Sequence, residues 1–169
     1  GVGSIRRNRI LYNEEFFGAL LANAGDGGGI FVGTNVVGGT GTGSVSIDAN
    51  LIQGNLCGAG TGGGIRVSGV NAQDIVDEPL DPALWNRLTI TNNVIANNVA
   101  GYSGGGISLQ DVVRATIDNN TIVNNDSTAT SALAFVPGQA NSTPAGWGVV
   151  SHAHSAALMG ILGRDRVGG

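Results

Sequence analysis

Two aspartates, Asp48 and Asp118, occupy the same place in a repeated phrase of the chain, directly after an isoleucine in "IDANLIQGN" and "IDNNTIVNN". A pair of carboxylates at a fixed separation is what glycoside hydrolysis requires, with one acting as general acid and the other as general base or nucleophile. Whether Asp48 and Asp118 can form such a pair depends on the elements that carry the phrase.

The acidic stretch "DIVDEPLD" offers four oxygen ligands of the kind that Ca²⁺ prefers, namely Asp74, Asp77, Glu78 and Asp81. Their spacing matches neither an EF-hand loop nor a glycine-rich calcium-binding nonapeptide. Pro79 and Pro82 lie among them and favour a stiff, solvated excursion. The sequence therefore predicts an acidic loop without a metal or other cofactor, and a Ca²⁺ site is the alternative.

Two histidines and one cysteine are the other residues with metal-binding or nucleophilic side chains. His152 and His154 in "SHAHS" would share one face of a strand and supply half of a metal site, but no third ligand is near them in sequence. Cys57 lies in "NLCGAGTGGGI" without a neighbouring histidine to act as its base. We therefore expect ordinary histidines and a small, buried cysteine.

The composition of the 169-residue chain differs from that of an average globular domain. The chain has 30 glycines and only 12 % charged residues, whereas typical proteins have about 7 % glycine and about 25 % charged residues. The net charge of −4 leaves no continuous basic face for nucleic acid. No run of about 20 apolar residues is present to span a membrane. Nucleic acid is therefore not an expected partner, and no membrane span is expected in this segment.

The phrase I-x-x-N-x-I-x-x-N occurs four times without a mismatch, beginning at Ile5, Ile47, Ile90 and Ile117. Each copy is followed by a glycine cluster and an aliphatic residue, which in the last copy is reduced to "GWGV". The shortest step, from Ile90 to Ile117, is 27 residues, which is enough for three short strands but not for a helix as well. Fixed periodic phrases of this kind indicate a repeat architecture.

Apolar residues near each copy alternate with polar ones, as in strands that bury one face. Leu88 and Ile90 share a face, for example, and Thr89 lies on the other. Strands that pair with their equivalents one turn later would form an all-β parallel β-helix of about four turns, with three short strands per turn. The isoleucines would then stack inside the coil, where burial of each contributes roughly 1.5–3 kcal/mol.

The repeated asparagines are expected at two bends of each turn. Asparagine tolerates the left-handed conformation, and its amide can bond to the equivalent amide one turn away. The sequence predicts two ladders, one of Asn8, Asn50, Asn93 and Asn120 and one of Asn13, Asn55, Asn98 and Asn125. The glycine clusters are assigned to the third bend, because no Lys-Ser/Thr pair or helix follows them as in a phosphate-binding loop.

The pairing of I-x-x-N with GGGI resembles the F-x-x-N and GGA-I repeats of chlamydial polymorphic outer-membrane proteins and other β-helical bacterial surface proteins. Residues 3–151 are similar to a right-handed parallel β-helix of the pectate-lyase-like kind. The resemblance implies an extracellular or cell-envelope location, with any export signal outside this segment. It implies no single activity, because such helices occur in lyases, hydrolases, adhesins, tail-spikes and stalks.

Steps longer than 27 residues reveal insertions between the repeated strands. The β-helix is expected to span residues 1–151, with loops leaving its corners at 14–26, 33–44, 68–86 and 126–145. Residues 14–22 are compatible with a short helix. Residues 152–169 are expected to form an irregular or short helical extension in what we take to be a segment of a longer chain. Loops along one edge of a solenoid usually carry its binding function.

The coil sets the separation of the two candidate catalytic acids. Successive turns would place four residues in one outward row, namely Arg6, Asp48, Thr91 and Asp118. Asp48 and Asp118 would then lie two turns apart, roughly 10 Å, whereas an inverting pair is about 6.5–9.5 Å apart. Solvated residues beside a turn are the simpler interpretation. Arg66 is expected to point outward from its strand and to pair with Asp77 or Glu78.

The sequence favours a non-catalytic, rigid module of an exported or cell-surface protein that displays loops for adhesion or assembly. The alternative is a carbohydrate-active β-helix, either a polysaccharide lyase or a glycoside hydrolase, with a site partly outside this segment. Expected partners are the remainder of a longer chain, neighbouring subunits, carbohydrate or a surface protein. An adjoining translocator domain would favour the first function, and an adjoining carbohydrate-binding module the second.

Overall fold

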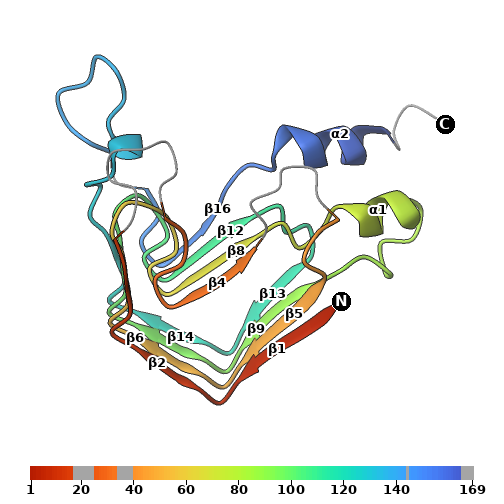
Figure 1. The fold of residues 1–169 in the computed structure, drawn as a ribbon, viewed down its shortest axis with the longest axis horizontal. Coiled ribbons are helices and arrows are strands. Elements are labelled where there is room, and N and C mark those ends of the chain that lie inside the picture. The colour runs from red at the N-terminus through yellow and green to blue at the C-terminus, as the bar shows by residue number, and fades with distance from the viewer. Residues whose placement is uncertain (17–24, 34–39, 144, 165–169) are drawn as a thin grey trace.

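The computed structural model describes residues 1–16, 25–33, 40–143 and 145–164. These residues wind into a parallel β-helix whose four turns stack one behind another in Figure 1. Four sheets run along the coil, and in each of them every strand pairs in parallel with its equivalent in the neighbouring turn. The predicted fold class and the predicted number of turns are therefore confirmed.

The first two turns contain β1 (Val2–Arg6), β2 (Arg9–Leu11), β3 (Glu14–Glu15), β4 (Ile30–Gly33), β5 (Ser44–Asp48), β6 (Leu51–Gln53), β7 (Leu56–Cys57) and β8 (Ile65–Ser68). The last two contain β9 (Leu88–Thr91), β10 (Val94–Ala96), β11 (Val99–Ala100), β12 (Ile107–Gln110), β13 (Ala115–Asp118), β14 (Thr121–Val123), β15 (Asp126–Ser127) and β16 (Val149–Ser151). The helical elements are α1 (Gln73–Asp77), the 3₁₀ turn η1 (Ala132–Ala134) and α2 (Ala156–Arg164).

Each turn contains one strand more than the three that the repeat predicted. The additional strands β3, β7, β11 and β15 are two residues long and form a sheet of their own. Two residues are too few to produce a visible alternation of apolar and polar side chains, so the sequence pattern could not separate them from the bend before them.

The core is a stack of aliphatic side chains inside the coil. The repeat isoleucines of the middle turns have no exposed surface, as at Ile47, Ile52, Ile90 and Ile95. Ile65 and Ile107 on the glycine-linked strands are equally buried. Ile117 and Ile122 pack against the same core but stay partly exposed, because no further turn covers them in this structure.

The structure brings the eight repeat asparagines together in two ladders. At each step the backbone N–H and the side-chain amide of one asparagine both donate to Oδ1 of the asparagine in the next turn. Asn50 bonds to Asn93 in this way, at 2.9 Å for both contacts. Nδ2 of Asn50 also donates to Ile5 O at 2.9 Å, which joins three turns. Each inner asparagine thus satisfies buried backbone groups on both sides.

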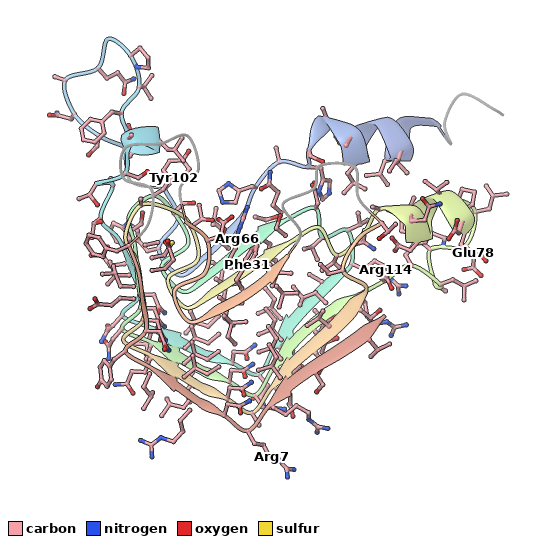
Figure 2. All side chains as sticks on the ribbon, viewed as in Figure 1. Arg7, Phe31, Arg66, Glu78, Tyr102 and Arg114 are labelled. Carbon is pink, nitrogen blue, oxygen red and sulfur yellow. The ribbon has the colours of Figure 1, made fainter. Side chains whose placement is uncertain are left out.

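The left-handed residue at these bends is not the ladder asparagine, contrary to expectation, but the residue before it. Asn92 has a φ of +58° and precedes Asn93, and Arg7 has a φ of +56° and precedes Asn8. Figure 2 shows Arg7 pointing outward at this bend. The turn is therefore made by an outward-facing residue, which leaves the next asparagine free to point its amide inward.

The glycine clusters form the remaining bend. Gly62 begins its cluster with a φ of +75°, and Gly104 has a φ of +64° in the next turn. A β-carbon on Gly64 would lie 2.7 Å from the carbonyl oxygen of Gly106, so the close approach of neighbouring turns also requires glycine. Just before each cluster, Asp26, Thr61, Ser103 and Ala145 continue the parallel pairing as isolated bridges.

The insertions leave the coil at its corners. The 68–86 insertion carries α1, which contacts α2, and Figure 1 shows both helices beside the strands. The 126–145 insertion carries η1 and extends away from the coil on the opposite side of the view. The helix considered for residues 14–22 lies largely outside the described residues, and Glu14–Glu15 form β3.

Candidate functional site

The two candidate catalytic acids share one outward row of the β1–β5–β9–β13 sheet. Strand register aligns Arg6 with Asp48, Asp48 with Thr91, and Thr91 with Asp118. Thr91 therefore separates the two aspartates, and its Oγ1 donates to Asp48 Oδ1 at 3.0 Å. The structure places Asp48 and Asp118 in one row but does not join them into a carboxylate pair.

Asp48 is held as an ionised acceptor. Its Oδ1 accepts from Asn92 Nδ2 at 2.8 Å and from Thr91, and its Oδ2 lies 3.5 Å from Arg6 Nη2. The hydrogen bond from Asn92 is the largest cause that lowers the pKa of Asp48, followed by Thr91, and the charge of Arg6 adds to them. A general acid requires the opposite shift, so Asp48 is unsuited to protonate a leaving group.

The four acids considered for Ca²⁺ do not converge on one point. Asp74 accepts from the N–H groups of Ala72 and Asn86 at 2.7 Å each, so its carboxylate closes the base of the 68–86 insertion. Asp77 bonds to Gln73 on α1, and Asp81 bonds to the backbone of Ala83. Among the residues that the structure describes, no group of three or more His, Cys, Asp or Glu side chains is arranged to hold a metal ion.

Cys57 is fully buried, as the sequence predicted. Burial raises the pKa of its thiol to about 12, and its Sγ lies 3.3 Å from Gly25 O. Because the thiolate is the nucleophilic form, a thiol with this pKa is unreactive near neutral pH.

A polar cluster that sequence reasoning missed covers the outer face of the fourth sheet, β4–β8–β12–β16. His152 Nε2 lies 3.2 Å from Ser103 Oγ and 3.1 Å from Ser108 Oγ, and Tyr102 stacks beside its ring. Arg66 Nη1 donates to Ser108 Oγ at 2.9 Å. These residues come from three turns, and those that bond across turns are 42 or more positions apart in sequence. No local sequence motif therefore predicts that they form a cluster.

Arg66 corrects one expectation from the sequence. It was expected to pair with Asp77 or Glu78, but its Nε lies 3.3 Å from Asp26 Oδ1 and its Nη2 donates to Gln110 Oε1 at 2.6 Å. Figure 2 shows Arg66 over the fourth sheet and Glu78 at the far edge of the molecule. Strand register decides the outcome, because it sets Arg66 directly beside Ser108.

The contact between Ser103 and His152 has the distance of a nucleophile and its base, but the surrounding geometry does not support catalysis. Both serines have no exposed surface and both approach the same ring nitrogen of His152. In a catalytic relay a third group orients the histidine through its other nitrogen, and none of the described residues bonds to His152 Nδ1. Burial and the nearby Arg66 charge lower the pKa of His152, which keeps the imidazole neutral at pH 7. The contacts of His152, Ser103, Ser108 and Arg66 therefore join neighbouring turns of the coil.

His154 belongs to a separate contact. Its Nδ1 lies 3.7 Å from Asp111 Oδ1, and the same oxygen accepts from the N–H of Ser155 at 2.7 Å. Asp111 therefore anchors the segment that leads from β16 into α2. The two histidines, which were expected to be ordinary residues, take part in different contacts.

The 68–86 insertion is tied to the coil by several hydrogen bonds. Asn71 Nδ2 donates to Asn86 O at 2.9 Å, and Asn71 Oδ1 accepts from Val113 N–H at 2.8 Å. Arg114 Nη1 donates to Ala83 O at 2.9 Å and also bonds to Pro82 O. The neighbouring turn therefore holds the insertion near its start, at Asn71, and towards its end, at residues 82–83, and Figure 2 shows Arg114 beside it.

The same insertion exposes aliphatic side chains. Leu80 is 90 % exposed and Leu84 is 61 % exposed, and Val76 on α1 is 48 % exposed.

No family model, curated protein or solved structure matches the chain. The structure thus shows a parallel β-helix, and none of these comparisons shows a pectate-lyase-like identity. Within the described residues, no helix has the length and apolar character needed to cross a membrane.

Proposed function

We propose that this chain is a rigid, non-catalytic β-helical module of an exported or cell-surface protein, and that it presents the 68–86 insertion to a binding partner. The observation that carries the proposal is the combination of anchored backbone and exposed aliphatic side chains in this insertion. Asn71, Asp74 and Arg114 hold it, and Leu80 and Leu84 face solvent.

Anchoring matters because association has to offset the entropy of ordering the surfaces that meet. A loop that is already fixed in place loses less freedom on binding than a mobile one. Exposed aliphatic side chains supply the apolar area that favours association. The asparagine ladders contribute at a distance, because they make the coil a stiff support for the insertion.

A binding experiment tests the proposal directly. The double variant Leu80→Ser/Leu84→Ser keeps the anchoring residues and removes the apolar surface, so it should lose most of the binding that the unchanged chain shows on arrays of polysaccharides and surface proteins. Val94→Ser/Val123→Ser is the matched control, since these valines are 41 % and 43 % exposed on the coil itself. Equal loss in both variants, or binding that survives in the first, would refute the role of the insertion.

The enzyme alternative has a test of its own. We expect the chain to form no unsaturated or reducing products from pectin, alginate or other uronic-acid polymers. The occupied carboxylate of Asp48 and the separation of Asp48 from Asp118 by Thr91 support this expectation. Product formation that disappears in Asp48→Ala or Asp118→Ala would make a carbohydrate-active enzyme the better proposal.

A further inference from the structure

The 68–86 insertion has a fixed shape of its own after α1. Two consecutive turns form there, because the N–H of Asp81 donates to Glu78 O at 3.3 Å and the N–H of Leu84 donates to Asp81 O at 3.1 Å. The indole Nε1 of Trp85 closes this segment by donating to Glu78 O at 2.7 Å. The insertion leaves the coil between β8 and β9, and each of these strands has a neighbour on both sides. Inner turns of the coil therefore set its position.

Three exposed acids lie next to the exposed leucines of this insertion in sequence, namely Asp77, Glu78 and Asp81. Residues 68–86 include no lysine or arginine. Within the part of the chain that the structure describes, none of the three acids takes part in an ion pair. Asp26 and Asp48 differ from them in this respect, because each of those aspartates lies beside an arginine.

Arg114 contacts the insertion without neutralising its acids. Its Nη1 donates to the backbone carbonyl groups of Pro82 and Ala83. Two of the acids are oriented by bonds within the insertion, since Asp77 Oδ1 accepts from Gln73 Nε2 at 2.8 Å and Asp81 Oδ1 accepts from the N–H of Ala83 at 3.0 Å. The insertion thus presents negative charge in a defined arrangement around its apolar side chains.

Apolar side chains beside like charges restrict the chemistry of a partner. A protein interface has an apolar centre and a polar rim, and the electrostatic potentials of the two partners are complementary. Carboxylates repel nucleic acid, anionic lipid and uronic-acid polymers, whereas arginine and lysine attract them. Leu80 and Leu84 need apolar side chains opposite them, which a neutral sugar or a small cation does not supply.

We propose that the 68–86 insertion binds a protein whose contact surface presents apolar side chains bordered by arginine or lysine. This inference rests on the proposed function and names the kind of partner that the same surface takes. Leu80 and Leu84 form the apolar centre of the contact, and Asp77, Glu78 and Asp81 face the partner's cations. The acids raise the rate of association and make it depend on salt, and the leucines slow dissociation.

A set of synthetic peptides tests the proposal on the complete chain by surface plasmon resonance. The probe is an amphipathic peptide with a leucine face flanked by arginine. One companion peptide carries citrulline, which is uncharged, in place of arginine, and a second carries serine in place of leucine. The chain should bind the probe at least about tenfold more tightly than either companion. High salt should weaken binding of the probe but not of the citrulline peptide.

A triple variant removes the charges and keeps the shape of the insertion. Asp77→Asn/Glu78→Gln/Asp81→Asn retains the oxygens that accept from Gln73 and Ala83. It should lower the association rate constant for the probe several-fold and remove most of the salt dependence. Leu80→Ser/Leu84→Ser should instead raise the dissociation rate constant.

The matched control is Glu14→Gln/Asp118→Asn/Asp126→Asn, which removes three charges from exposed acids on the coil itself. Its affinity for the probe should stay within about twofold of that of the unchanged chain. Circular dichroism melts establish that all variants fold. Failure to bind the probe, equal binding of the probe and the citrulline peptide, or equal losses in the two triple variants would each overturn the inference.

The outcome for the proposed function is read separately. Binding on the arrays of polysaccharides and surface proteins that requires Leu80 and Leu84 but survives the triple variant of the insertion would refute the basic partner and leave the proposed function standing. Array binding that survives in Leu80→Ser/Leu84→Ser would refute both.

Discussion

Two polar networks cross the turns of this coil, one inside it and one on its outer face, and they are built in opposite ways. The inner ladders repeat one residue type with one bonding pattern, as between Asn55 and Asn98, and both of these asparagines are fully buried. The outer cluster joins an arginine, a histidine and two serines, each with different partners. Repetition lets every inner step satisfy its neighbours, whereas the outer cluster is a single arrangement.

The outer cluster is also the less completely satisfied of the two. Arg66 Nε is buried and lies near Asp26, but the contact does not have hydrogen-bond geometry. The contact is an ion pair by distance alone, and such a pair contributes less to stability than an aligned, charge-assisted hydrogen bond. We therefore expect each buried asparagine of the inner ladders to contribute more to stability than each residue of the outer cluster.

The largest effect is expected inside the coil. Asn93→Ala removes the acceptor of Asn50 and the donors to Ile47 O and Asn120, all at a position that is 1 % exposed. Leaving these groups unmet should lower the free energy of unfolding by about 1–3 kcal/mol, measured by urea denaturation. Asn120→Ala is the control at the open end, where water can replace the lost amide, and it should cost less. Equal losses would show that burial does not control the strength of the ladder.

A smaller effect is expected at the outer cluster. Arg66→Met keeps much of the side-chain volume and removes the contacts to Ser108, Gln110 and Asp26. Each lost hydrogen bond contributes about 1 kcal/mol net, and removing a buried charge also removes its desolvation penalty, so the free energy of unfolding should fall by less than in Asn93→Ala. A loss greater than that of Asn93→Ala, in the same urea experiment, would reverse the comparison.

The pH dependence of the outer cluster gives a third test. Burial and the Arg66 charge lower the pKa of His152 below its ordinary 6.5. The unfolded chain therefore binds a proton at a higher pH than the folded chain, and stability should fall as the pH drops below about 6.5 until the folded histidine also protonates. His152→Gln should remove this dependence. In Arg66→Met, NMR titration should show a higher pKa for His152, and an unchanged pKa would contradict the stated role of Arg66.

The smallest effect is expected on the outward row that bears Asp48. The pKa of Asp48 is lowered, chiefly by Asn92 and then by Thr91, so its contribution is present above the ordinary value of 3.8 and is lost as the pH falls through the folded pKa. Asp48→Asn should therefore change the melting temperature only slightly at pH 7 and flatten the acid limb of the stability curve. A large loss at pH 7 would mean that this outward row supports the coil as strongly as the ladders do.

Much of the fold could be predicted because the repeat occurs four times and each copy indicates the same contact between neighbouring turns. A residue that recurs at the same place in each turn must meet its own copies in neighbouring turns, so the inward direction of Ile52 and Ile95 follows from periodicity, and both are fully buried. The two-residue strands escaped prediction because they carry no period. The left-handed conformation was predicted for Asn93, but the residue before it, Asn92, adopts it. The repeat points to Asn93 because asparagine recurs at that position in every copy.

The sequence by itself determined the coil, the order of its repeated strands and the side chains that point inward. These features depend on the regular spacing of the repeated isoleucines and asparagines. Only the tertiary structure decided the partners of the residues that do not recur. Asp26 meets Arg66 because two separate turns lie side by side, and Asp74 meets Asn86 because the two ends of the 68–86 insertion return to the same place. Such contacts depend on side-chain reach and on where each insertion returns to the coil. Neither quantity leaves a periodic trace in the sequence.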